Sequence, residues 1–251
     1  MSDDDADLPG WDAERADALL SALNAAAADG VRPGAREALD PVHRGRELQR
    51  LLGLRGELPA RTLAAIWREL EGARLARSTA LRLAVWGGAQ PEAVVAQARR
   101  RFGAAPPIAL AREPQQAVAA AQAPGVVGVL PLEGAWWGRM LARPDVRVFA
   151  AAWPESYSGL GHGPPLALAV AAVELDATGD DRTFWVTDAA GPAPRVEAQL
   201  GEAGFAADLA AEAGGLMLWM LAGYVQPDDP RLARAPGRLT GVIGAAPGPI
   251  S

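Results

Sequence analysis

Cysteine and lysine are both absent from this chain of 251 residues, and histidine occurs only at His43 and His162. Without cysteine there is no disulfide, no thiolate metal site and no thiol nucleophile. Without lysine no side chain can form a Schiff base, and two histidines cannot build a multi-histidine metal site. These absences exclude most hydrolase and metalloenzyme mechanisms, and we expect a protein without a cofactor.

Long apolar runs and an excess of positive charge are also missing. The longest strongly apolar run, "GLMLWMLAGYV" at 215–225, is about half of what a membrane span needs. The first residues, "MSDDDADLPG", are acidic and polar, which is unlike a signal peptide. The net charge of -6 and the pI near 5.1 argue against general nucleic-acid binding. We therefore expect a cytoplasmic protein whose partners include neither nucleic acid nor membrane.

The first part of the chain, residues 1–78, is predicted to be a helical domain. Asp12 can cap a first helix whose apolar residues follow a helical period, and the glycines and proline of 29–34 end it. A second leucine-rich helix is predicted over 46–54. A third begins near Pro59, since proline is favourable at the first helical position. Its predicted apolar stripe comprises Leu63, Ile66, Trp67, Leu70 and Ala73.

In residues 79–176 the pattern changes to short apolar strands that alternate with helices. The predicted strands are "LRLAVWG", "PPIALA", "GVVGVLPLEG", "DVRVFAAAWP" and "LALAVAAVEL". Helices are predicted over 91–103, 114–122 and 136–142. Near-continuous apolar strands are typical of a buried parallel sheet, so we predict an α/β domain with a mostly parallel sheet.

The last part, residues 177–251, repeats a different order of elements. Strand "RTFWVTD", helix 194–204, a hairpin across Gly214 and Gly215, a short helix and strand "LTGVIGA" give the order βαββαβ, followed by a loose tail. This is the ferredoxin-like order. The predicted fold class is therefore α+β multidomain, with helical, α/β and ferredoxin-like domains in succession.

The segment "PVHRGRELQRLLGLRGELPARTLAAIWRELEGA" (41–73) resembles the second and third helices of the all-helical chorismate mutases. The segment "EPQQAVAAAQAPGVVGVLPLEGAWWGRML" (113–141) is similar to the prephenate dehydratase pattern, and residues 177–251 resemble the ACT domain. The three in this order resemble a bifunctional mutase–dehydratase. The resemblance implies isomerisation of chorismate to prephenate in aromatic amino-acid biosynthesis, and it leaves a homodimer open.

Chorismate is a dianion whose rearrangement needs a compact conformer and stabilised charge, for which bidentate guanidinium groups are suited. Carried over by motif, the resemblance implies that Arg46 and Glu47 are catalytic. Arg36, which can replace a lysine of the family, and Arg44 are expected to share the cleft and bind the substrate.

Three further polar contacts of the mutase family fall on the region of Pro9, on Ala26 or Ala27, and on Ser78. Each charge-assisted contact is worth about 1.5 to 3 kcal/mol, so their loss predicts mutase activity that is weak or lost. The alternative is a non-catalytic binding or regulatory protein of the same architecture. The threonine-arginine-phenylalanine signature of the dehydratases is absent from its expected place, which argues against dehydration.

The turn "PLEG" and the tryptophans after it form a second candidate site. Carboxyl ends of parallel strands are where α/β domains bind ligands, and Glu133 and Trp136 follow such an end. We therefore add Glu133 and Trp136 as candidate substrate-binding residues, with core packing as the alternative for the tryptophan. The loop "SYSGLGHGPP" (156–165) lacks the glycine-serine-glycine spacing of a nucleophile elbow and is expected to be a plain loop.

Overall fold

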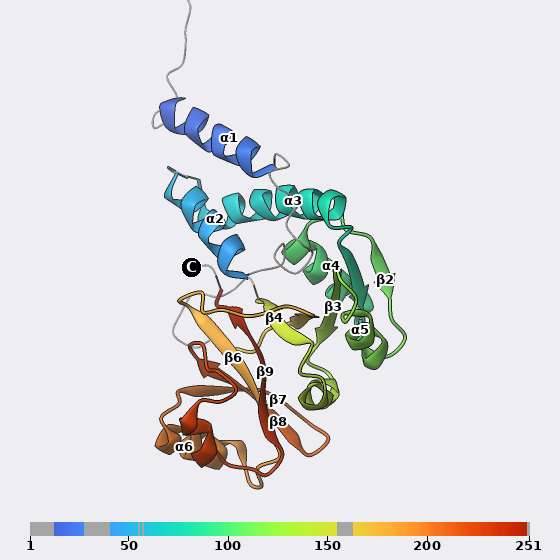
Figure 1. Ribbon diagram of the computed structural model, residues 1–251, viewed down its shortest axis with the longest axis vertical. Helices are drawn as coiled ribbons and strands as arrows, with labels where there is room; N and C mark the ends of the chain where they lie inside the picture. Colours follow the sequence, from blue (N-terminus) through green and yellow to red (C-terminus); the bar gives the residue numbers. More distant parts are fainter. Residues whose placement is uncertain (1–12, 28–40, 55, 57, 155–162, 250–251) are drawn as a thin grey trace, which may run out of the picture.

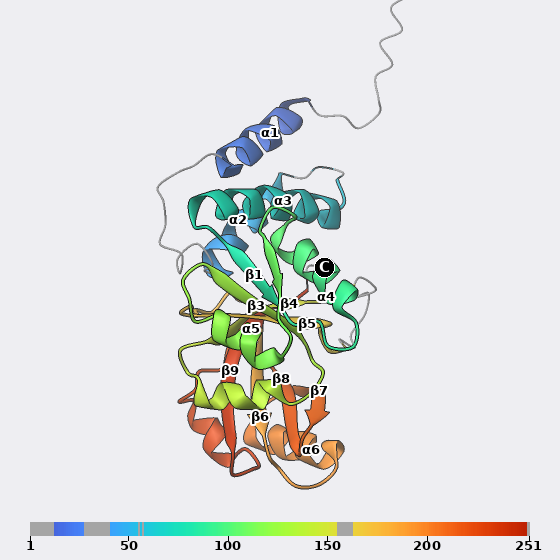
Figure 2. The same cartoon turned by 90° about the vertical axis from the view of Figure 1, so that its right-hand side faces the viewer.

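The structure, a computed structural model, describes residues 13–27, 41–54, 56, 58–154 and 163–249. Three helices form one end of the described molecule, as both Figure 1 and Figure 2 show. They are α1 (Ala13–Ala27), α2 (Pro41–Gly53) and α3 (Ala60–Ser78). The second helix was predicted to begin at Arg46 and begins at Pro41, because proline needs no hydrogen-bonded N–H in the first turn of a helix.

The three helices pack around a small apolar core. Its buried members are Leu19, Leu51, Leu52, Leu63 and Trp67. The apolar period therefore identified these inward positions, but Leu20 of α1, which follows the same period, is 58% exposed. The stripe predicted for α3 was too wide, however.

Ile66, at one margin of that α3 stripe, is 42% exposed. Helices α1 and α2 bury Leu63 and Trp67 but leave Ile66 exposed, although the three residues belong to one helical stripe. The width of the buried face thus depends on the neighbouring helices and not on α3 alone.

All nine strands of the described chain belong to one sheet, in the order β2-β1-β3-β5-β4-β9-β6-β8-β7. The strands are β1 (Arg82–Val85), β2 (Ile108–Leu110), β3 (Val126–Pro131), β4 (Arg147–Ala152), β5 (Ala167–Ala171), β6 (Asp181–Thr187), β7 (Ala207–Ala213), β8 (Leu216–Ala222) and β9 (Thr240–Pro247). Each strand predicted from the sequence is present.

The expectation of a mostly parallel sheet over residues 79–176 is correct for only part of it. Strand β1 pairs in parallel with β2 and β3, whereas β5 is antiparallel to both β3 and β4. The parallel pairs follow from the helical crossovers between β1, β2 and β3. The apolar composition of β5 reflects burial on both faces, which does not by itself specify strand direction.

Helices cover both faces of this sheet. They are α4 (Pro91–Phe102), α5 (Pro114–Ala120), the 3-10 helix η2 (Trp136–Ala142), α6 (Ala193–Ala203) and the 3-10 helix η3 (Pro230–Arg234). Buried side chains of α4 pack with one face of β1, β3, β4 and β5, while α5 and η2 pack on the other face. Helix α6 covers the far end of the sheet, on β6 and β8 (Figure 1).

Strands β6 to β9 have the sheet order β9-β6-β8-β7, and every neighbouring pair among them is antiparallel. The crossover from β6 through α6 to β7 leaves a place for β8 between them, as in a split βαβ unit. The hairpin between β7 and β8 turns at Gly214 and Gly215, which both have positive φ. Two-residue hairpins require this conformation, for which glycine is suited.

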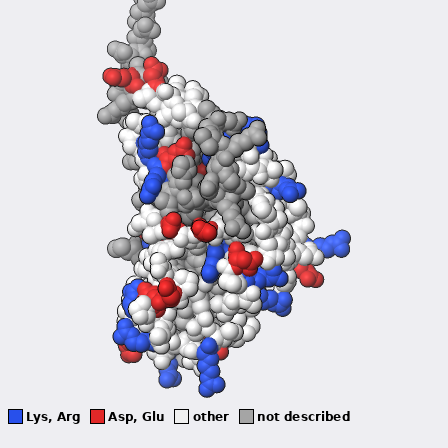
Figure 3. Space-filling view, in the orientation of Figure 1, with Lys and Arg blue, Asp and Glu red and all other residues white. Residues whose placement is uncertain are grey.

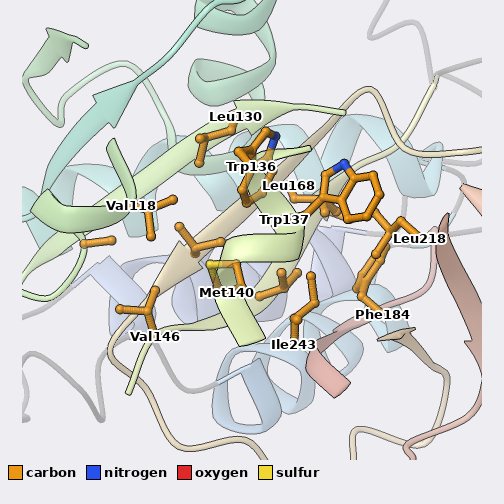
Figure 4. Close-up of a cluster of buried hydrophobic side chains, with 14 of the residues drawn as sticks. Val118, Leu130, Trp136, Trp137, Met140, Val146, Leu168, Phe184, Leu218 and Ile243 are labelled. Carbon is orange, nitrogen blue, oxygen red and sulfur yellow. The ribbon is translucent and has the colours of Figure 1, made fainter. Parts of the chain in front are cut away.

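One apolar core joins the two parts of the sheet (Figure 4). Trp136, Trp137 and Met140 of η2 are buried in it, together with Val148 of β4 and Phe184 of β6. Helix η2 contacts β6, β8 and β9, although it follows β3 in the chain. The expected domain boundary after residue 176 therefore divides a chain whose parts share a sheet and a core.

A close backbone contact attaches the helical end to the sheet. Gly72 of α3 lies against the carbonyl oxygen of Phe102, at the end of α4. A Cβ at position 72 would overlap that oxygen, so only glycine allows the two helices to approach so closely. Gly103, with φ of 78°, continues the chain away from α3.

Among the residues described, no helix combines the length and the apolar character that crossing a membrane requires. Most of the loop expected at 156–165 lies outside the described residues.

Candidate functional site

The α2 helix carries the arginine and glutamate that the sequence suggested as catalytic. Leu51 and Leu52 are buried against α1 and α3, which determines the face of α2 that is turned outward. In this orientation Arg46 is exposed and Glu47 is half-buried. The predicted pair thus lies on the accessible part of α2, with Glu47 nearer to the protein interior than Arg46.

A groove of about 590 Å³ runs between α1 and α2. Alanines of α1, Ser21, Gly53 and Leu54 form its walls, so that small side chains leave it open. Arg50 also lines the groove and is exposed. Residues four apart are neighbours on a helix surface, so Arg46 and Arg50 lie one turn apart on the same side of α2.

Arg50 was not among the residues selected from the sequence. The spacing of four residues from Arg46 is the sequence signal that identifies Arg50, which lies beyond the "GRE" triplet. Arg36 lies outside the described residues, and the side chain of Arg44 is also outside them. A cleft shared by Arg46 with Arg36 or Arg44 therefore stays a prediction.

Glu133 follows β3 and is exposed at the carboxyl end of that strand, as predicted. Its Oε2 atom accepts a hydrogen bond of 2.8 Å from the backbone N–H of Ala89, in the turn between β1 and α4. Gly88, with φ of 55°, lies so close that a Cβ there would overlap the carboxylate. The carboxylate of Glu133 thus links two loops at the end of the parallel strands.

Trp136 is buried, with 3% of its surface exposed, and its indole lies in the core that Figure 4 shows. Its Nε1–H donates a hydrogen bond of 2.7 Å to the carbonyl oxygen of Pro131, at the end of β3. This bond satisfies a polar group that would be costly to bury alone. The geometry is that of the packing alternative, since the indole faces the interior.

The structure does not bring the two predicted sets of residues into one pocket. The α1–α2 groove is lined by neither Glu133 nor Trp136, both of which follow β3 in the chain. Among the described residues, no group of three or more histidine, aspartate or glutamate side chains is arranged to hold a metal ion. Positive and negative side chains are interspersed on the face that Figure 3 shows.

No protein-family profile and no curated protein matches the chain. Among solved structures, one described as "GqqA- a novel type of quorum quenching acylases" superposes with a TM-score of 0.42 and 12% identity, over 67% of this chain and 96% of the other. The prephenate dehydratase from Staphylococcus aureus superposes with a TM-score of 0.38 and 12% identity, over 65% of this chain and 99% of the other. Both similarities are distant, and we carry no residue role over from either. The chain is thus a mixed α+β protein with a prephenate dehydratase as a weak structural neighbour.

Proposed function

We propose that this chain is a chorismate mutase-like protein of the cytoplasm that binds a small dianion, of the chorismate or prephenate type, on α2, and that it has weak or no mutase activity. The observation that carries the proposal is the pair of exposed guanidinium groups on one side of α2, since Arg50 lines the α1–α2 groove and Arg46 lies one helical turn before it. Each can donate hydrogen bonds to one carboxylate of the ligand.

The expected affinity follows from these two contacts. Hydrogen bonds to charged groups contribute about 1.5 to 3 kcal/mol each, so two contribute about 3 to 6 kcal/mol. A dissociation constant of about 1 mM corresponds to about 4.1 kcal/mol. Because both guanidinium groups are exposed, these energies are upper limits. The expected dissociation constant is therefore about 1 mM or weaker, and it should rise as salt screens the two groups.

Turnover requires more than binding. Only contacts that are stronger in the transition state than in the ground state accelerate a reaction. An open groove lets water solvate the ether oxygen on which charge develops, and Arg46 itself is exposed. Glu47, half-buried beside Arg46, is the group of α2 that would accept from the substrate hydroxyl if the site turns over.

Calorimetric titration with chorismate and with prephenate tests the binding. Arg46→Gln and Arg50→Gln should each weaken binding about threefold, because both guanidinium groups are exposed and partly screened. Arg82→Gln, which removes an exposed arginine at the start of β1, is the matched control and should bind like the wild type. If neither compound binds at several times the expected dissociation constant, or if both α2 variants bind like the wild type, the proposal is wrong.

The disappearance of chorismate on adding purified protein measures the mutase activity in the same samples. We expect a rate close to that of buffer. A rate typical of enzymes, abolished by Arg46→Gln or Glu47→Gln, would show instead that the site is a working mutase.

A further inference from the structure

The two parts of the sheet meet at β4 and β9. Strands β4 and β9 pair in parallel through one register position, Val148 with Gly244. Gly244 approaches the backbone of Val148 so closely that a Cβ would overlap it. Beside this junction, which we call the seam, lies a half-open pocket of about 560 Å³. That volume is within the usual range of small-molecule sites.

Two polar side chains of the pocket cross the seam and hold its shape. Arg147, at the start of β4, donates from Nη1 to the carbonyl oxygen of Val242 in β9, at 3.1 Å. Tyr224, which follows β8, donates from its hydroxyl to the carbonyl oxygen of Leu175, at 2.6 Å. Each bond joins the strands before residue 176 to the strands after it. The walls of the pocket are therefore positioned before any ligand arrives, which lowers the entropic cost of binding.

The charged groups around the pocket are mostly acidic. Asp145, Glu174 and Asp176 line it and are exposed, while Arg147 is the only basic residue among the described residues that line it. A hydrogen bond from Gln122 holds the pKa of Asp145 below its usual range, so this carboxylate is ionised at neutral pH. The excess of two negative charges favours a positively charged ligand.

Carboxylates also surround the phenol of Tyr224. Burial raises the pKa of its phenol, and the carboxylates of Asp176 and Asp181 raise that pKa further, against the opposing effect of Arg147. Two carboxylates and one guanidinium thus act on the phenol, in agreement with the mainly acidic lining of the pocket. A cation placed there would be attracted, and the aromatic ring could also contact it through its face.

The inner wall of the pocket is apolar. Val173, Val225 and Val242 line it and are buried, with Ala245 beside them. These side chains offer contact to an apolar body and no partner for a second charge. The pocket thus has an acidic mouth, one aromatic ring with a polar tip and an apolar floor.

From this arrangement we infer that the seam pocket binds a small organic cation, an amine with an apolar body whose ammonium group lies among Asp145, Glu174 and Asp176. The carboxylates supply the charge, and the valine floor contacts the apolar body. This site is separate from the α2 groove, and it does not depend on the function proposed for that groove.

A matched pair of probes tests the inference on the full chain. Phenethylamine and hydrocinnamate have similar apolar bodies and opposite charges. Ligand-detected NMR titration should show binding of phenethylamine, with hydrocinnamate at least about tenfold weaker. Asp176→Asn and Glu174→Gln should each weaken phenethylamine binding about threefold, because both carboxylates are exposed and partly screened.

The control variant is Glu197→Gln, on the exposed face of α6, which should bind phenethylamine like the wild type. Equal or tighter binding of hydrocinnamate, no binding of phenethylamine, or a double variant of Asp176 and Glu174 with unchanged affinity would overturn the inference. Phenylalanine binding more tightly than phenethylamine would also overturn it, because Arg147 would then hold a carboxylate. Chorismate binding should be unchanged in the Asp176 and Glu174 variants, which separates this site from the α2 groove.

Discussion

The carboxylate of Glu133 accepts a hydrogen bond from the backbone N–H of Ala89 at 2.8 Å, and it thereby joins the end of β3 to the turn that precedes α4. The two residues are 44 positions apart in the chain. The contact places a negative charge near the amino end of α4, where the exposed N–H groups of a helix favour it.

Replacing Glu133 by alanine should therefore lower stability and loosen this turn. We expect Glu133→Ala to reduce the free energy of unfolding by about 0.5 to 1.5 kcal/mol, the range of an ordinary hydrogen bond, because the bond is exposed. Urea denaturation measures this, and hydrogen exchange at Ala89 should become faster. Glu113→Ala is the control, since Glu113 is also exposed and lies at the amino end of a helix, α5, but makes no capping bond with its side chain. Equal effects of the two variants would contradict the role given to Glu133.

A comparison of Trp136 with Trp137 tests how much the hydrogen bond from the Trp136 indole to Pro131 stabilises the fold. Both rings are buried, but Nε1 of Trp136 donates to Pro131, while Nε1 of Trp137 has no partner among the described residues. Trp136→Phe should cost about 1 kcal/mol more than Trp137→Phe, because only the former leaves a buried carbonyl without its donor. The comparison is made by urea denaturation. Weaker chorismate binding in Trp136→Phe, with stability unchanged, would instead support the ligand-binding role predicted from the sequence.

Two helical glycines should respond to alanine in opposite directions. Gly72→Ala introduces a Cβ that overlaps the carbonyl of Phe102, so we expect a loss of about 1 to 3 kcal/mol from overpacking. Gly201→Ala in α6 meets nothing within 4 Å and should gain up to about 1 kcal/mol from helix propensity. Thermal and urea denaturation measure both changes. A neutral Gly72→Ala would show that α3 and α4 can separate without cost.

Tyr224 makes the free energy of unfolding depend on pH in the alkaline range. Its folded-state pKa is raised by burial, by Asp176 and by Asp181, whereas the unfolded pKa is about 10. The contribution of the phenol to the stability of the fold is therefore fully present below about pH 10, and it is lost as the pH rises through the higher folded-state pKa. Relative to Tyr224→Phe, the wild type should lose stability only above about pH 10. A difference that stays constant up to about pH 12 would mean that the phenol is not perturbed.

The sequence by itself determined the local elements. Apolar periods placed the helices and strands within a few residues. The glycine pair at 214 and 215 identified the β7–β8 hairpin, because glycine, which has no Cβ, adopts positive φ without strain. The segment "GRELQR" also contains Arg50, and its position four residues after Arg46 places both arginines on the same side of a helix.

Only the tertiary structure decided which faces are covered and which strands are neighbours. Ile66 and Trp136 illustrate how the covered faces are decided. Ile66 is exposed and Trp136 is buried, because neighbouring elements pack against Trp136 and leave Ile66 uncovered. The seam illustrates how neighbouring strands are decided, because the pairing of Val148 with Gly244 and the bond from Arg147 to Val242 join segments almost a hundred residues apart. Such contacts depend on how the whole chain closes around one core, and no local pattern specifies them.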